Sequence, residues 1–196
     1  MTRTVALVRT LPLPRLRLIG VPILFAALMA AASYVRIPIP GSPVPMTMQV
    51  VVVLVAGGLL APGAAASAMI LFTLAGAAGL PVFQGGGGGI LHLAGPTGGY
   101  ILGFIAAAPL ISCLAGARRD ASLRVVLAMV SGLGLIHLTG MTQLAIYFGG
   151  DFLLAFTQGV LPFLPLDLVK IAVAVPVVMA VGSLTANGGA ATSNRS

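Results

Sequence analysis

The sequence predicts an all-α integral membrane protein in which helices cross the bilayer about six times. Hydrophobic residues make up 59% of the 196 residues and charged residues only 7%, whereas a soluble domain carries about 25% charged residues. Because each crossing needs about 20 apolar residues, six transmembrane helices use almost the whole length. We therefore expect lipid bilayer around most of the surface, and no soluble catalytic or nucleotide-binding domain.

The first crossing is expected at residues 18–35, after a basic N-terminal segment, residues 1–17. A secretory signal peptide has the same order of basic and apolar residues, but this run ends at Arg36 and a series of prolines, without a small-residue cleavage site. We therefore interpret the run as a membrane helix. The prolines exclude regular helix after it and force extended or turn backbone; they are Pro38, Pro40, Pro43 and Pro45.

Residues 46–60 and 64–80 predict a helical hairpin, because the turn-forming sequence Ala61-Pro62-Gly63 separates the two apolar runs. A long loop follows and contains five consecutive glycines, residues 85–89. A glycine run can let the backbone approach a ligand closely or can move as a lid, and its plain alternative is a flexible linker. The position between two helices favours the first interpretation.

Two long apolar runs follow the glycine loop and predict the fourth and fifth crossings. Residues 97–116 form the fourth run, for which Thr97 is the expected N-cap. Residues 125–148 form the fifth run, which Gly149-Gly150-Asp151 ends. We interpret Asp151, like Asp120, as a solvated loop charge.

The remaining sequence predicts one more crossing. Residues 152–160 are amphipathic but too short to cross a bilayer. The last crossing is expected at residues 166–184, so the six-helix domain covers residues 18–184. We expect residues 185–196 to form a disordered cytoplasmic tail.

The basic residues predict the orientation of the chain. The formal net charge is +7, but the basic residues are scattered at the ends of apolar runs, without the dense basic face that binding to nucleic acid requires. They cluster before the first crossing and between the fourth and fifth, so the positive-inside rule places both termini in the cytoplasm. The proline-rich and glycine-rich loops then face outward, where we expect a recognition site. The residues concerned are Arg3, Arg9, Arg15, Arg17, Arg118, Arg119 and Arg124, and only Arg36 lies on the opposite side.

Asp167 and Lys170 form the one conspicuous charge pair within a predicted crossing. Ionisable groups in a bilayer are costly, so a functional role is the default interpretation. The two residues are three apart on a helix and share a face near its outer end. Lys170 could fix a ligand carboxylate, and Asp167 could accept hydrogen bonds from ligand N–H groups. The alternative is an internal salt bridge; we favour function, because apolar residues would pack the helix without any desolvation cost.

Several other residues leave two interpretations open. Gln49 could present its amide to a ligand or cap loop carbonyls, and Tyr100 could stack on a ligand or lie in the interfacial aromatic belt. His92 and His137 lack a second metal-ligating residue at suitable spacing, so we expect no metal site. Cys113 lies in an apolar run, where we expect a structural role.

Alanines on the first helix repeat at a spacing that permits close helix approach, as in Ala26 with Ala30 and Ala27 with Ala31. This face could pack within the molecule or against another membrane subunit. The chain has no Walker motif, so we expect no ATP hydrolysis of its own. An energy-dependent role would therefore need a partner.

Four segments occur in an order that resembles the BioY family, and the resemblance covers about residues 18–184. The segments are Pro43-Val44-Pro45-Met46-Thr47-Met48-Gln49, Gly79-Leu80-Pro81-Val82-Phe83, Gly95-Pro96-Thr97-Gly98-Gly99-Tyr100 and Asp167-Leu168-Val169-Lys170. This family comprises the substrate-binding S components of biotin energy-coupling-factor (ECF) transporters. The resemblance implies a six-helix S-component fold that captures biotin from outside the bacterial inner (plasma) membrane.

The resemblance also implies partners and roles. A transmembrane T component and two ATPase subunits would couple through the alanine face of the first helix. Lys170 would pair with the biotin carboxylate, and Asp167 would accept from a ureido N–H group.

Further residues would complete the pocket that the resemblance implies. They are Gln49, Tyr100 and the loop from Phe83 through Gln84 and Gly85. In that loop five glycines replace a more varied sequence, so a polar contact from Gln84 is the least expected. The alternatives are an S component for another vitamin and an intramembrane enzyme. We expect no catalytic residues or cofactor, since paired His-Glu and Gly-x-Ser-x-Gly motifs are missing.

Overall fold

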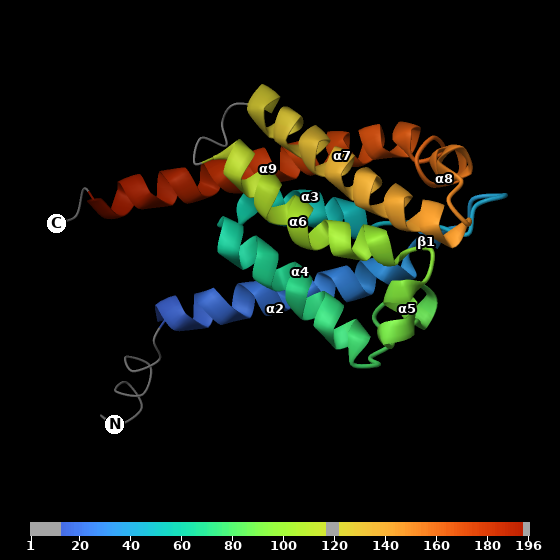
Figure 1. Ribbon diagram of the computed structural model, residues 1–196. Coiled ribbons are helices and arrows are strands. Elements are labelled where there is room, and N and C mark those ends of the chain that lie inside the picture. The colour runs from blue at the N-terminus through green and yellow to red at the C-terminus, as the bar shows by residue number, and fades with distance from the viewer. Residues whose placement is uncertain (1–12, 117–121, 194–196) are drawn as a thin grey trace.

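The computed structural model is a bundle of helices with its short strands and short helices gathered at one end (Figure 1). It describes residues 13–116 and 122–193, with side chains from Ile19 to Gly116 and from Ser122 to Gly182. The basic residues Arg3, Arg9, Arg118 and Arg119, and also Asp120, lie outside the described residues. The orientation inferred from those arginines therefore stays a prediction.

The first described helix, α2 (Leu13–Tyr34), packs on the bundle along one narrow face. Phe25, Met29 and Ser33 are buried on that face, at the spacing of an amphipathic helix. The face contacts α3 (Gln49–Leu59) and α4 (Pro62–Ala77). The helix begins five residues before the start that we predicted at residue 18.

The proline-rich segment forms a small antiparallel hairpin, as the prolines predict for extended backbone. Strand β1 (Arg36–Ile37) pairs with β2 (Met46–Thr47), so that Arg36 lies opposite Thr47. The hairpin delays the start of α3 to Gln49, which leaves that helix 11 residues long. At 1.5 Å per residue α3 spans about 16 Å, about half of the ~30 Å hydrocarbon core of a bilayer.

The glycine-rich loop is folded, and the flexible-linker interpretation is wrong. It contains two short helices that we did not predict, η1 (Gln84–Gly86) and α5 (Ile90–Ala94). The Phe83 N–H group donates to the Gly87 carbonyl at 3.0 Å, which closes a tight turn. Within the turn Gly85 and Gly86 have φ angles of 72° and 78°, a left-handed conformation that glycine adopts without strain.

Helices α6 (Gly98–Ala115) and α7 (Ser122–Tyr147) form the centre of the bundle. Of the described apolar spans, α6 is the most enclosed, with 61% of its residues buried. Gly103 on α6 and Gly140 on α7 face the neighbouring helix, where an added Cβ would clash, so small residues set the close approach. Thr97 occupies the N-cap position of α6 as predicted, but its side chain makes no capping hydrogen bond.

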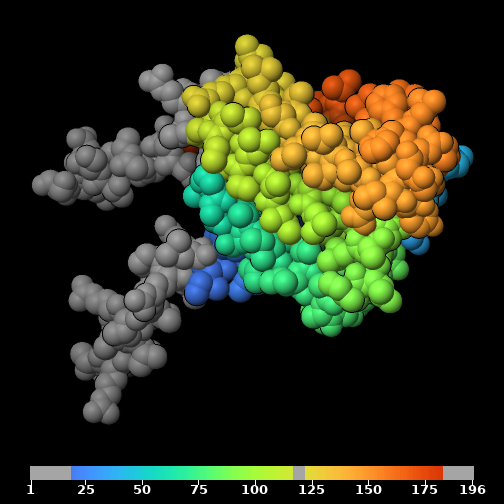
Figure 2. Space-filling view, in the orientation of Figure 1, coloured from blue at the N-terminus to red at the C-terminus, as the bar shows by residue number. Residues whose placement is uncertain are grey.

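Helix α7 ends where predicted, at glycines of positive φ, and α8 (Phe152–Gly159) follows. The carboxylate of Asp151 accepts a hydrogen bond from the Leu154 N–H group at 2.8 Å. This exposed residue is therefore a helix cap and not only a solvated charge. In the space-filling view α6, α7 and α8 present a continuous surface at this side of the bundle (Figure 2).

The last helix, α9 (Leu164–Ser193), extends beyond its predicted end at residue 184. The expected disordered tail is thus helical through Ser193. Helix propagation adds one backbone hydrogen bond per residue, and no proline follows Pro176 to interrupt it. The start of α2 and the far end of α9 lie at the end of the bundle opposite the hairpin, α5 and α8 (Figure 1).

Three helical segments in the described part of the chain are long and apolar enough to cross a membrane: α6, α7 and residues Leu164–Gly182 of α9. The other apolar helices, Ile19–Tyr34, α3 and α4, are shorter. The all-α prediction is confirmed, whereas the described residues do not confirm the count of six crossings. The hairpin takes up apolar sequence that we assigned to the second crossing.

We predict that Gly57→Ala destabilises the bundle, whereas Gly134→Ala does not. A Cβ on Gly57 would lie 2.6 Å from the Ile111 Cβ and 2.8 Å from the Ala108 carbonyl oxygen, while a Cβ on Gly134 meets nothing within 4 Å. Overpacking costs about 1–3 kcal/mol, whereas alanine in an open helix position gains about 0.5–1 kcal/mol. Thermal unfolding midpoints in one detergent test this, and equal midpoints would contradict the packing between α3 and α6.

Candidate ligand-binding site

A cavity lies where the hairpin segment, α3, α6, α7 and the start of α9 meet. The free space within it is about 40 Å³, smaller than the usual small-molecule site. Apolar and polar residues contribute to its wall in equal number. The polar side chains are Thr47, Gln49, Gln84, Thr97, Tyr100, His137, Asp167 and Lys170.

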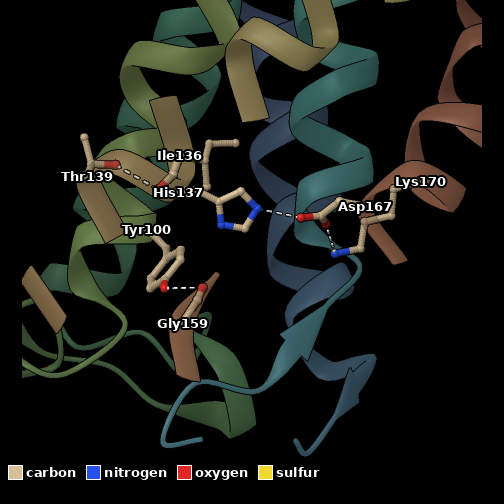
Figure 3. Close-up of polar contacts among 7 residues, drawn as sticks. All are labelled: Tyr100, Ile136, His137, Thr139, Gly159, Asp167 and Lys170. Carbon is tan, nitrogen blue, oxygen red and sulfur yellow. Dashed lines mark hydrogen bonds and ion pairs between the residues drawn. The ribbon is translucent and has the colours of Figure 1, made fainter. Parts of the chain in front are cut away.

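The carboxylate of Asp167 is shared between two nitrogen-bearing side chains (Figure 3). Lys170 Nζ lies 2.9 Å from Oδ1, and His137 Nε2 lies 2.6 Å from Oδ2. Asp167 and Lys170 are only 4% and 6% exposed, so solvent screens this pair very little. The charge of Asp167 is therefore neutralised and hydrogen-bonded from both sides, by α9 itself and by α7.

The start of α9 places the two charges on one face. The N–H group of Asp167 donates to the Phe163 carbonyl at 2.9 Å, in the first turn of the helix. A negative side chain is favourable there, because helix N-termini carry a partial positive charge. Lys170 follows one turn later at i+3, as the sequence predicted, and reaches back to the same carboxylate.

Aromatic rings form one wall of the cavity. The ring centroid of Tyr100 lies 6.4 Å from that of Phe163 and 6.4 Å from that of His137. The Tyr100 hydroxyl donates to the Gly159 carbonyl at 2.7 Å, and the ring is 8% exposed. The aromatic-belt alternative is therefore wrong for Tyr100, because its ring faces the cavity instead of the lipid.

Gln49 lies on the cavity wall at the first residue of α3, as predicted. Its Oε1 accepts from the Thr47 hydroxyl at 3.1 Å, and its Nε2 donates to the Met29 carbonyl at 3.5 Å. The side chain thus connects the hairpin to α2. One N–H bond of the amide remains for a ligand, so the two roles that we considered are compatible.

The structure separates the three residues predicted from the glycine-rich loop. Gln84, the least expected, is the one that lines the cavity. Phe83 is fully buried elsewhere, with its ring 5.5 Å from that of Phe72 and 5.0 Å from that of His92. Gly85 is exposed and lies against the guanidinium of Arg36. Phe83 and Gly85 do not line the cavity, because Phe83 anchors the loop in the core, and their contact with a ligand stays a prediction.

His137 is the site residue that the sequence analysis missed. We considered it only as a metal ligand, and among the described residues no group of three or more His, Cys, Asp or Glu side chains could hold a metal. The available signal was its position in a membrane helix, where an ionisable side chain requires a partner. The partner, Asp167, is 30 residues away, so local spacing could not identify it.

The alanine pairs of α2 divide between two environments. Ala26 and Ala30 are half-buried and pack against the core, whereas Ala27 and Ala31 are exposed. Ala26 and Ala30 therefore serve packing within the bundle, and a partner at the exposed pair stays a prediction.

A second, apolar hollow lies on the other side of Lys170, between the hairpin, α3 and α9. Its wall includes Val51, Val169 and Val173. Thr47 and Lys170 line both this hollow and the cavity. At this position the cavity wall is therefore only one side chain thick.

Comparison with known proteins identifies relatives over most of the chain. The BioY family model matches residues 6–187. The chain is 41% identical to a probable biotin transporter BioY of Pyrococcus horikoshii over 152 residues, which cover 78% of this chain and 88% of that protein. It is 37% identical to the biotin transporter BioY of Thermotoga maritima over 151 residues, 77% of this chain and 87% of that protein.

A solved structure shares the fold. The crystal structure of the S-component for biotin from an ECF-type ABC transporter matches with a TM-score of 0.80 and 23% sequence identity. The match covers 87% of this chain and 93% of that chain. The arrangement of helices described above is therefore that of an S component.

We predict that Asp167 and Lys170 are strongly coupled in stability. Asp167→Leu leaves the Lys170 ammonium buried without its partner, which costs about 3–5 kcal/mol. The double variant Asp167→Leu/Lys170→Leu removes both charges, so its unfolding midpoint should lie above that of either single variant. Thermal unfolding of the four proteins in one detergent tests this. Losses that simply add would show that the two side chains do not interact.

Proposed function

The chain belongs to the BioY family, and we propose that it is the biotin-binding S component of an ECF-type uptake transporter in the bacterial cell membrane. One observation carries the proposal: a chain with only 7% charged residues holds the buried pair Asp167 and Lys170 in the wall of a cavity. Buried charges are costly, so their position in the cavity wall indicates recognition of a ligand. Relatives named as biotin transporters match this chain over about three quarters of its length.

We propose that Lys170 binds the carboxylate of biotin and that Asp167 accepts from its ureido group. These groups lie at opposite ends of an apolar ligand, whereas Lys170 Nζ and Asp167 Oδ1 are 2.9 Å apart. Contact with both ends therefore requires Lys170 to turn away from Asp167, which its flexible four-carbon stem permits. His137 stays on Asp167, so the carboxylate keeps a hydrogen bond when Lys170 leaves. Gln49, Gln84 and Tyr100 complete the site.

We further propose that six helices cross the bilayer, namely α2, α3, α4, α6, α7 and α9. The short α3 spans only part of the depth, and the hairpin occupies the rest. Non-helical backbone is tolerated at membrane depth where protein covers it, and the β2 residues Met46 and Thr47 are buried. Under the positive-inside rule both termini are cytoplasmic, so the cavity opens to the outside.

Energy coupling is proposed to occur through α2. Ala27 and Ala31 leave a flat, exposed strip one helical turn long, the kind of surface on which another membrane helix can pack closely. The occupant that we propose is the transmembrane T component, which would connect the chain to two ATPase subunits. The chain itself would supply recognition only.

We predict that the purified protein binds biotin and that Lys170 binds the biotin carboxylate. The unsubstituted protein should prefer biotin over biotin amide about 10- to 100-fold, the value of a charge-assisted hydrogen bond. Lys170→Met keeps the bulk of the side chain without its charge, so this preference should disappear in the variant. Isothermal titration calorimetry in detergent measures both ratios.

The same titrations contain their controls. Thiamine and riboflavin should not bind, and a protein that bound either of them in place of biotin would be an S component for another vitamin. A Lys170→Met variant that still preferred biotin over its amide would place the carboxylate elsewhere. Absence of biotin binding by the unsubstituted protein would contradict the proposed function.

We predict that Ala27→Leu impairs coupled transport without weakening biotin binding. The substitution adds bulk to the strip where we place the T component, and Ala27 is remote from the cavity lining. Ala106→Leu is the matched control, because Ala106 is also exposed but lies on α6. Uptake of labelled biotin by cells that express the coupling module tests this. Equal uptake by the two variants would argue against the α2 strip.

A further inference from the structure

We propose that His137 contacts the ligand directly, with its Nδ1 accepting a hydrogen bond from a ligand N–H group. The proposal rests on the proposed function, because it takes the ureido group of biotin as the donor. It starts from a single atom. His137 Nδ1 is buried and has no hydrogen-bond partner, and it is the one such side-chain nitrogen or oxygen found among the described residues.

The contacts of the imidazole determine which nitrogen carries the proton. Nε2 lies 2.6 Å from Asp167 Oδ2, and the adjacent ammonium of Lys170 favours the ionised form of that carboxylate. An ionised carboxylate only accepts hydrogen bonds, so Nε2 must be the donor. In the neutral imidazole Nδ1 then carries a free lone pair. In that tautomer the buried atom without a partner is an acceptor.

The free lone pair faces the site and not the lipid. Figure 3 shows Nδ1 on the side of the ring turned away from Asp167, toward Tyr100 and Gly159. His137 lines the cavity, and the rings of Tyr100 and Phe163 lie 6.4 Å and 6.3 Å from its own. The Tyr100 hydroxyl cannot satisfy Nδ1, because it already donates to the Gly159 carbonyl. We place the missing donor on a ligand in the cavity.

The surroundings of His137 hold its ring in one orientation, so the direction of the Nδ1 lone pair is fixed. The hydrogen bond to Asp167 fixes the ring from one side, and the aromatic wall fixes it from the other, so binding requires little reordering of the side chain. An unpaired buried nitrogen is unfavourable in the empty site. A ligand that presents an N–H group to Nδ1 removes this penalty. A ligand with an oxygen at the same place is disfavoured, because the lone pairs of the oxygen and of Nδ1 repel each other. His137 therefore favours ligands that carry a hydrogen-bond donor there.

The test replaces one ureido N–H group of biotin at a time. Two cyclic carbamate analogues, each with one N–H replaced by oxygen, are titrated into the full-length protein in detergent. One analogue should bind the unsubstituted protein at least about 10-fold more weakly than biotin because of His137. In His137→Leu, which removes the acceptor, that difference should shrink to about 3-fold or less. His92→Leu, the matched control outside the cavity lining, should retain it.

A second measurement separates this proposal from the proposed function. The chain has two histidines, so the ring ¹⁵N signals of His92→Gln belong to His137 alone. Ligand-free protein should show a protonated Nε2 and an unprotonated Nδ1, and biotin should shift the Nδ1 signal toward that of a hydrogen-bonded acceptor. A protonated Nδ1, or carbamate differences unchanged in His137→Leu, would overturn the role of His137 while biotin binding stands. Failure of the unsubstituted protein to bind biotin would instead overturn both proposals.

Discussion

The carboxylate of Asp167 is the constraint on which the rest of the site depends. It is one of three acidic residues in the chain and it is buried. Its contact with His137 holds α7 and α9 together, while Lys170 bonds to it from α9 itself. A buried charge of this kind contributes little net stability, because desolvation offsets the attraction between the partners. Its retention is better explained by recognition than by folding. The two partners also differ in mobility, since lysine has a long flexible stem and the imidazole is fixed by neighbouring rings.

The second constraint is the shortness of α3. A helix that crossed the full bilayer would fill the space that the cavity occupies, because Pro45, Thr47 and Gln49 line the cavity at the start of α3. The prolines prevent helix there and the hairpin replaces it. Irregular backbone needs hydrogen-bond partners inside the protein at this depth. The pairing of β1 with β2 supplies such partners, and the Met48 N–H group donates to the Val35 carbonyl at 3.1 Å. The Thr47 and Gln49 side chains bond to each other, and Gln49 ties this segment to the Met29 carbonyl of α2.

Sequence reasoning identified the elements better than their contacts. Apolar runs and turn residues located most helix ends to within a few residues, because these signals are local; the start of α2 and the end of α9 are the exceptions. The pair Asp167 and Lys170 was also local, at i and i+3 of one helix. The contact with His137 joins residues 30 apart, and the burial of Phe83 depends on Phe72 and His92, so neither follows from spacing. The hairpin was only partly predictable, since prolines exclude helix but do not specify which strands pair. The helical conformation of residues 185–193 carried no strong signal in either direction.

At Lys170 the cavity is separated from the apolar hollow by a wall only one side chain thick. The side chains of Thr47 and Lys170 separate the cavity from an apolar hollow on the surface that we propose faces lipid. The methylene groups of the lysine stem therefore act as a partition between hydrocarbon and a polar compartment, while its ammonium belongs to that compartment. If Lys170 turns toward a ligand, the partition changes shape with it. Ligand binding and the contact of α9 with lipid then both depend on the same rotation of the Lys170 side chain.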